Sequence, residues 1–259
     1  MIGECKRCGG SGLICVERKT GAEVYGKDVP LIFTEPCPEC NGGHEVKVQK
    51  VKQRANIPPS FYEATLESFE LNAYLDDKNQ VIDLSQQRKF VESFVNDFMK
   101  WEERGLGLYL WSSIRGTGKT FLASCICNEL MKRTPIVTKF VSACELIKMN
   151  EEDRKRNFTK PQIDILCECN LLVIDDLGQQ KTGENYVDDI LFRIIDYRYQ
   201  HKLVTIVTSN IKLANLRLDD RVTDRLNKMC QPVPLPDFSF RQKENVASKK
   251  EFLKEMGLM

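Results

Sequence analysis

The segment that most constrains the fold of this chain runs from residue 108 to residue 123 and reads LYLWSSIRGTGKTFLA. An apolar stretch, a loop of small residues and a helix-forming stretch follow one another, as in a strand that enters a helix through a glycine-rich turn. Free N–H groups at the beginning of such a helix attract anions, and glycines let the backbone wrap around phosphate oxygens. The usual pattern is G-x-x-x-x-G-K-[ST], and Ser113 stands here in place of its first glycine.

The positions of this loop predict a nucleotide site. Lys119 is expected to reach the β- and γ-phosphates, and the hydroxyl of Thr120 to ligate Mg²⁺. Ser113 is small and polar, so we expect it to be tolerated at the loop entrance at the cost of some strain. The predicted nucleotide-binding residues are Ser113, Ile114, Arg115, Gly116, Thr117, Gly118, Lys119, Thr120 and Phe121.

Two carboxylates follow at the end of a later apolar strand, in NLLVIDDLG (170–178). Asp175 falls where an ATPase holds Mg²⁺ through its water shell, and Asp176 falls where a base or a water-positioning group is needed. The strand LVTIVTSN (203–210) ends in Asn210, which we expect to orient the attacking water or to sense the γ-phosphate. Each of these residues alone is also compatible with an ordinary turn. Their combination with the loop indicates an ATPase.

The segment LDDRVTDRLNKM (218–229) places Arg221 and Arg225 four residues apart, on one face of an expected helix. One interpretation is that both arginines are solvated and paired with Asp220 or Asp224. The alternative is an arginine that reaches the ATP of a neighbouring subunit, where it stabilises charge in the transition state.

Apolar periodicity predicts an alternation of strands and helices. We expect strands at 107–112, 136–141, 171–175 and 203–208. We expect helices at 84–104, 119–133, 142–150, 161–168, 184–201 and 219–229, the first with Ser85 as its N-cap and Gly105 as its stop. Strands separated by helices predict an α/β fold with a parallel sheet that is covered on both faces.

Charge and hydropathy narrow the classes of partner. The chain of 259 residues carries 38 basic and 37 acidic side chains, so any binding of nucleic acid needs a local basic surface. No apolar run approaches the roughly 20 residues that span a bilayer, and no apolar signal core is visible at the N-terminus. We therefore expect no membrane association and a cytoplasmic location.

The first 45 residues are rich in cysteine and glycine and contain two C-x-x-C knuckles, CKRCGGSG (5–12) and CPECNGG (37–43). Thiolates at this spacing grip one tetrahedral Zn²⁺, and glycines permit the tight turn around sulfur. The first knuckle also matches the repeat of DnaJ-type zinc domains. Cys15 and His44 are spare candidates, and a redox-active C-x-x-C pair is the alternative. The predicted ligands of a structural zinc are Cys5, Cys8, Cys37 and Cys40.

The zinc module is expected to end within NIPPS (56–60), where Pro58 and Pro59 interrupt any regular element. The preceding stretch 46–54, VKVQKVKQR, alternates apolar and basic residues and predicts a solvated basic strand. Residues 1–56 would then form the zinc-binding module with its basic linker. The six later cysteines lie mostly in apolar segments, where we expect them to be small buried residues.

The order of these motifs resembles AAA+ ATPases of the DnaC/DnaI family, which load bacterial or phage replicative helicases, with IstB-type helper ATPases as relatives. The resemblance covers residues 57–242. It rests on IPPSFYEATLESF (57–69), which in this family packs near the adenine, and on LLVIDDLG, IIDYRYQHKLVTIVTSN and RVTDRL in the same order. It implies an AAA+ P-loop NTPase with a three-layer αβα architecture, an ATPase core at 57–235 and a reduced lid in a C-terminal segment at 236–259.

The resemblance also implies roles and partners. Arg225 would be the arginine finger in trans, and Arg241 in DFSFR (237–241) a second phosphate sensor. Asp176 stands where many AAA+ proteins have glutamate, which affects the expected hydrolysis rate. The implied cofactors are ATP, Mg²⁺ and Zn²⁺. The implied partners are a replicative DNA helicase, single-stranded DNA and further copies of the chain in an ATP-dependent homo-oligomer.

Three functions stay open on this basis. The first is an ATPase that loads a replicative helicase onto single-stranded DNA. The second is a transposition helper of the IstB type, and the third is a nucleotide-gated adaptor that hardly hydrolyses ATP. The zinc module would dock the helicase, or bind DNA through Lys6, Arg7 and the basic strand at 47–54.

Overall fold

A computed structural model describes the chain in several stretches. These are residues 7, 13–18, 23–24, 27–28, 31–36, 38, 52–69, 74–76, 78–155, 160–178, 185–240, 253–254 and 256. The chain divides into two compact units, Met1–Arg54 and Ala55–Met259.

The N-terminal unit contains two short antiparallel ladders that periodicity did not predict. β1 (Leu13–Arg18) pairs with β4 (Leu31–Pro36), and β2 (Glu23–Val24) pairs with β3 (Lys27–Asp28). The four predicted zinc ligands lie outside the described residues, as do Lys6 and His44. Zinc binding therefore stays a prediction.

The prediction of a basic strand at 46–54 is wrong at its C-terminal end, because residues 52–55 are helical. Lys52 and Ala55 are both buried, whereas Gln53 and Arg54 between them are exposed. Burial three residues apart is the spacing of a helix and not of a strand. The remainder of that stretch lies outside the described residues.

The larger unit is built on one parallel sheet of five strands in the order β6-β7-β8-β5-β9. The strands are β5 (Gly107–Trp111), β6 (Thr138–Ser142), β7 (Leu171–Leu177), β8 (Val204–Ser209) and β9 (Cys230–Pro234). The helices are α2 (Ser85–Asn96), α3 (Phe98–Arg104), α4 (Lys119–Arg133), α5 (Ala143–Lys155), α6 (Gln162–Glu168), α7 (Asn185–Gln200) and α8 (Asp220–Met229), with 3-10 turns η1 (Pro59–Phe61) and η3 (Leu213–Asn215).

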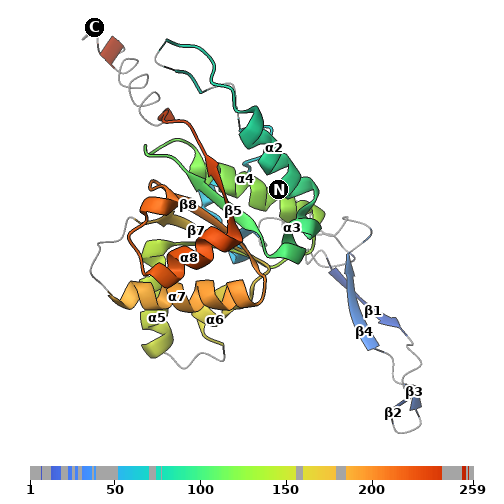
Figure 1. Cartoon of the computed structure of the whole chain (residues 1–259). Coiled ribbons are helices and arrows are strands. Elements are labelled where there is room, and N and C mark those ends of the chain that lie inside the picture. Colours follow the sequence, from blue (N-terminus) through green and yellow to red (C-terminus); the bar gives the residue numbers. More distant parts are fainter. Residues whose placement is uncertain are drawn as a thin grey trace. The chain divides into compact units, whose positions relative to one another are not determined.

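Two apolar cores cover the two faces of this sheet. Leu108 and Leu110 of β5 pack into the core that includes α2, α3 and α4, whereas Tyr109 between them packs into the core that includes α5, α6, α7 and α8. This alternation is the two-residue period of a strand that is buried on both sides. The result is the expected three-layer α/β architecture, with the helices of the two cores on opposite sides of the sheet (Figure 1).

Three local features of the unit differ from the sequence prediction. The helix expected at 84–104 is interrupted at Asp97, which separates α2 from α3, although Gly105 ends α3 in the left-handed conformation as expected. Ser85 is not the N-cap, because the helix begins at Ser85 and the carboxylate of Asp83 accepts its backbone N–H at 2.9 Å. Of the six later cysteines, Cys144 is exposed and the others are buried.

The fifth strand, β9, was missed. Its sequence CQPVP contains Pro232 and Pro234, which cannot donate to a ladder and therefore argue against a central strand. β9 lies at the edge of the sheet and pairs with β5 alone, so the missing donors face away from the ladder. Within the described part of the chain, no helix combines the length and the apolar character that crossing a bilayer would require.

A candidate nucleotide site at the carboxyl edge of the sheet

The predicted phosphate-binding loop connects the end of β5 to the beginning of α4, where Lys119 is the first helical residue. Gly116 and Gly118 have φ angles of 79° and 85°, a conformation that favours glycine. Ser113 is not among the non-glycine residues that have positive φ in the described chain. The strain that we expected at this serine is therefore absent, because its position does not require the backbone freedom of glycine.

The carbonyl groups of the loop are hydrogen-bonded to its surroundings. The backbone N–H of Phe240 donates to Gly116 O at 3.0 Å, and the hydroxyl of Tyr74 donates to Thr117 O at 2.6 Å. Because the C=O and N–H of one trans peptide point in opposite directions, these bonds turn the N–H groups of Thr117 and Gly118 the other way. A phosphate-binding loop needs this orientation, in which N–H groups face the anion.

Lys119 lies inside the loop and is 5% exposed. Its ammonium group donates to Ile114 O at 2.9 Å and to the hydroxyl of Thr117 at 3.0 Å. These contacts hold a positive charge at the centre of the loop, at the N-terminus of α4. The arrangement is suited to binding an anion with several negative charges.

Asp237 anchors the entrance of the loop, although it is not among the residues that the sequence pattern predicts for the site. Its Oδ1 accepts the hydroxyl of Ser112 at 2.8 Å and the N–H of Ser113 at 3.0 Å, and its Oδ2 accepts the hydroxyl of Ser113 at 2.6 Å. The hydrogen bond from Ser113 is the main reason that the pKa of Asp237 is lowered. A glycine at position 113 could not make the hydroxyl contact, so the departure from the usual pattern has a structural partner.

The two predicted magnesium ligands lie together. The hydroxyl of Thr120 donates to Oδ1 of Asp175 at 3.0 Å, across the edge between α4 and β7. Burial is the main cause that raises the pKa of Asp175, which is 8% exposed. A hydroxyl and a carboxylate at this separation are the hard oxygen donors that Mg²⁺ prefers, so the residues fit this ion.

Asp176 and Asn210 extend the same edge of the sheet. Asp176 is exposed and has a φ of 55° at a bulge where the register between β7 and β8 shifts. Asn210 follows directly after β8, which lies between β7 and β5. Its Oδ1 is buried and has no hydrogen-bond partner within the described residues. Such an atom is available to a ligand or a water molecule at the site.

The predicted arginines are held within their own chain. Arg225 pairs with Asp196 of α7, with Nε 2.5 Å from Oδ1, and its guanidinium lies 4.9 Å from the ring centre of Phe192. Arg221 lies 4.1 Å from the same ring and binds the carboxylate of Asp219. The acidic partners are thus Asp219 and Asp196 and not the two aspartates that spacing suggested. The action of Arg225 on a neighbouring subunit stays a prediction.

The other predicted nucleotide-binding residues at positions 114–121 lie in or beside the loop. Arg115 is exposed, and the half-buried ring of Phe121 packs against the rings of Phe61 and Phe69 at centroid distances of 5.6 Å and 6.3 Å. Arg241 lies outside the described residues.

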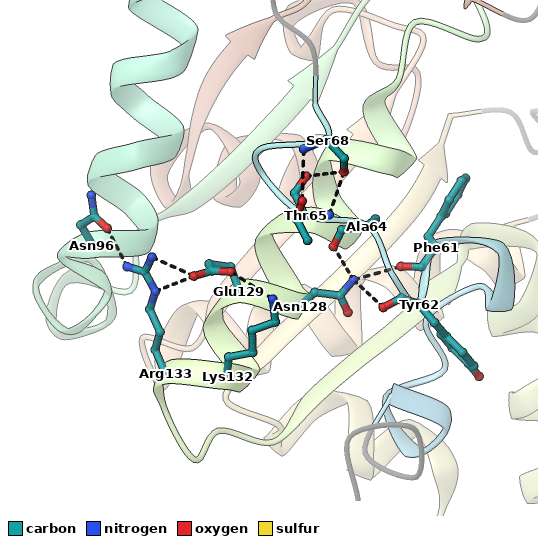
Figure 2. A network of polar contacts seen from close by, with 10 residues as sticks. All are labelled: Phe61, Tyr62, Ala64, Thr65, Ser68, Asn96, Asn128, Glu129, Lys132 and Arg133. Carbon is teal, nitrogen blue, oxygen red and sulfur yellow. Dashed lines mark hydrogen bonds and ion pairs between the residues drawn. The ribbon is translucent and has the colours of Figure 1, made fainter. Parts of the chain in front are cut away.

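The segment that precedes the core is tied to the helix that carries the loop. The side-chain amide of Asn128 on α4 donates to the carbonyls of Phe61, Tyr62 and Ala64 at 2.9, 3.3 and 2.8 Å (Figure 2). Further along, Phe69 and Tyr74 approach the loop itself. A Cβ on Gly118 would meet their side chains at 3.3 Å and 3.2 Å, which gives this glycine a steric reason in addition to its φ angle. The location of the adenine stays a prediction.

Comparison with known proteins identifies similar chains. The profile of a family described as "IstB-like ATP binding protein" matches residues 44–248. The replicative helicase loader DnaC of Escherichia coli strain K12 is 29% identical over 184 residues, which cover 70% of each chain. The replicative helicase loader DnaI of Bacillus subtilis strain 168 is 25% identical over 198 residues, which cover 75% of this chain and 59% of that protein.

Among solved structures, a crystal structure of DnaI is 27% identical with a TM-score of 0.57, and the match covers 70% of this chain and 95% of that one.

Proposed function

The chain belongs to the IstB-like ATP binding protein family, and from that premise we propose that it is a Mg²⁺-dependent ATPase that loads a replicative DNA helicase onto single-stranded DNA. The observation that carries the proposal is the pairing of two features at one edge of the sheet. The phosphate-binding loop holds Lys119 at its centre. The first turn of the following helix brings Thr120 to 3.0 Å from Asp175.

The residues of this site divide the work of ATP binding. Lys119 and the N–H groups of the loop bind the phosphates, and Thr120 and Asp175 would hold Mg²⁺. When bound, the ion neutralises part of the phosphate charge and orients the γ-phosphate. Asp176 and Asn210 orient the attacking water from the ends of β7 and β8. Arg225 reaches the ATP of the next subunit in an oligomer, after it leaves Asp196.

The loading of a helicase is supported by the names of the similar proteins, DnaC and DnaI, both of which are replicative helicase loaders. The N-terminal unit, with zinc held by its cysteines, docks the helicase or contacts DNA. The C-terminal segment acts as a reduced lid over the nucleotide, and the protein works in the cytoplasm with its helicase partner.

A second candidate is a nucleotide-gated adaptor, and the geometry of Asp176 favours it. This residue has a shorter side chain than the glutamate common in AAA+ proteins, and it is exposed in a left-handed conformation at a bulge. Both features place the carboxylate less securely for activating water. An IstB-type helper ATPase stays the third alternative, because the matching family carries that name.

The first experiment measures the binding of a fluorescent ATP analogue to Lys119→Ala. The substitution removes the cation at the centre of the loop, and we expect tight binding to be abolished. The matched control is Lys132→Ala on the same helix, where the lysine is 47% exposed and pairs weakly with Glu129 at 3.5 Å. We expect unchanged affinity in the control. Equal affinity in both variants would refute the nucleotide site.

The second experiment separates the three functions. ATP turnover is measured with and without single-stranded DNA, and co-purification with the replicative helicase of the same cell is measured with and without ATP. A loader turns over ATP and binds the helicase, and an adaptor binds the helicase with negligible turnover. A transposition helper turns over ATP but does not bind the helicase, and this result would overturn the loading proposal.

A further inference from the structure

Thr208 of β8 contacts both acidic residues of the candidate site through one hydroxyl group. The hydroxyl donates to Oδ1 of Asp175 at 2.5 Å and accepts the backbone N–H of Asp176 at 2.9 Å. The side chain of Thr208 is fully buried, so water does not compete for these bonds. A hydroxyl supplies one donor and two acceptor positions, and here the donor serves one acid and an acceptor serves the next.

The second of these bonds stabilises an irregular backbone. Between Ile174 and Leu177 the register of β7 against β8 shifts, and Asp176 adopts a φ of 55°. Residues other than glycine adopt this left-handed conformation rarely, so the backbone here needs support from its surroundings. The N–H of Asp176 donates to the side chain of Thr208 in place of a backbone carbonyl on the neighbouring strand. The threonine hydroxyl therefore replaces a missing rung of the ladder at the bulge.

The first bond orients the carboxylate of Asp175. Its Oδ1 accepts from Thr208 on one side and from Thr120 at 3.0 Å on the other. A free aspartate rotates about its terminal torsion at little cost, because this torsion has only broad preferences. A buried hydroxyl on a β-branched side chain with restricted χ1 removes that freedom. The carboxylate is thereby held facing the helix that carries the other predicted magnesium ligand.

We propose that Thr208 is a positioning residue that sets the geometry of Asp175 and Asp176 at the edge of the sheet where Mg²⁺ would bind. It orients Asp175 for the ion, and it holds the bulge that turns Asp176 outward. The inference rests on the proposed ATPase function. It assigns a role to a residue that the sequence does not distinguish from the other threonines of the β-strands.

The test compares three single substitutions. Thr208→Val has the same shape without the hydroxyl, and Thr208→Ser keeps the hydroxyl without the methyl group. The matched control is Thr138→Val on β6, a buried threonine whose hydroxyl has no hydrogen-bond partner within the described residues. All variants are first compared by circular dichroism and thermal unfolding, so that a folding defect is recognised.

The primary measurement is the Mg²⁺ dependence of binding to a fluorescent ATP analogue, with turnover as the second readout. For Thr208→Val we expect the Mg²⁺ concentration at half-maximal effect to rise about tenfold, because partners of metal ligands change metal affinity by this order. Affinity for the analogue in EDTA should stay within about twofold. Thr208→Ser should recover most of the Mg²⁺ response, and Thr138→Val should match the unmodified protein.

The outcomes separate this inference from the proposed function. An unmodified protein that binds no ATP analogue overturns the ATPase proposal, and this inference with it. Binding that responds to Mg²⁺ equally in the unmodified protein and in Thr208→Val overturns the inference alone. A defect in Thr208→Ser together with an unchanged Mg²⁺ response in Thr208→Val would show that packing of the methyl group matters and not the hydroxyl, and would overturn the inference. If Thr208→Val does not fold, Thr208→Ala provides the same comparison.

Discussion

Arg198 of α7 offers the sharpest test of how this fold is held together. Its guanidinium is fully buried and pairs with no carboxylate within the described residues. It donates instead to the hydroxyl of Thr205 at 2.9 Å and to Val204 O at 2.5 Å on β8, and to Cys169 O at 2.8 Å after α6. Longer bonds reach the carbonyls of Leu166, Cys167 and Asn170.

These contacts place one side chain at the junction of two helices and a strand. The carbonyls of the last turn of α6 have no partners inside their helix, and the arginine supplies donors to them. Burial is the main cause that lowers the pKa of Arg198. The charge is therefore costly to bury, and its donors offset that cost only while all the carbonyls are in place.

We expect Arg198→Met to lower the free energy of unfolding by about 3 kcal/mol. Each buried carbonyl left without a donor costs about 1–3 kcal/mol, and the two shortest bonds from Arg198 to carbonyls reach Cys169 O and Val204 O. Relief from burying a charge offsets part of this loss. For a unit of this size, the loss corresponds to a fall of about 6–12 °C in the unfolding temperature.

The matched control is Arg193→Met, five residues earlier on α7. Arg193 also contacts α6, through an ion pair with Asp164 at 2.6 Å, but its side chain is 55% exposed. Exposed pairs contribute about 0–1 kcal/mol, so this variant should unfold within about 4 °C of the unmodified protein. Urea and thermal unfolding followed by circular dichroism measure both variants. A loss in Arg198→Met that equals the loss in Arg193→Met would refute the reasoning.

Three further predictions concern the site and the N-terminal unit. Asp237→Ala removes three hydrogen bonds at the loop entrance and should weaken binding of a fluorescent ATP analogue about tenfold. Ser113→Gly keeps the backbone contact with Asp237 and should weaken binding less. A larger loss of affinity in Ser113→Gly than in Asp237→Ala would contradict the anchoring role of Asp237. Metal analysis should find about one zinc per chain, and Cys37→Ser should release it without loss of ATP binding; a chain that folds fully without zinc would count against the module. Arg225→Ala should leave the ATP affinity of the monomer unchanged and lower DNA-stimulated turnover on the order of 10³-fold. Mixing this variant with Lys119→Ala should restore part of the turnover. If assemblies shown to contain both variants recover no turnover, Arg225 serves only as the partner of Asp196.

Local patterns in the sequence were sufficient to predict the framework of the larger unit. The four strands with continuous apolar runs lie within a few residues of their predicted bounds, and α4 begins at Lys119 as the loop motif required. Such features depend on residues close together in the chain, namely on apolar periodicity and on glycines at fixed positions. The two motifs assigned Thr120 and Asp175 to one Mg²⁺, and their approach agrees with this because parallel strands present their carboxyl ends at one edge.

Contacts between distant segments decided the rest. β9 contains two prolines that argue against a strand, and only its place at the edge of the sheet makes them acceptable. Asp237 follows Ser113 by more than a hundred residues, and nothing near either residue in the sequence indicates that they pair. The absence of strain at Ser113 likewise depends on a backbone angle that the sequence pattern does not specify.

The two threonines of β8 show the limit most clearly. Thr205 and Thr208 are both fully buried in one short strand, and their neighbours in VTIVTS are alike. The hydroxyl of Thr205 accepts from Arg198, whereas the hydroxyl of Thr208 binds Asp175. A polar group buried in an apolar layer must find a hydrogen-bond partner, and this requirement can be read from the sequence. Which partner it finds depends on the element packed beside it, and only the tertiary structure decides that.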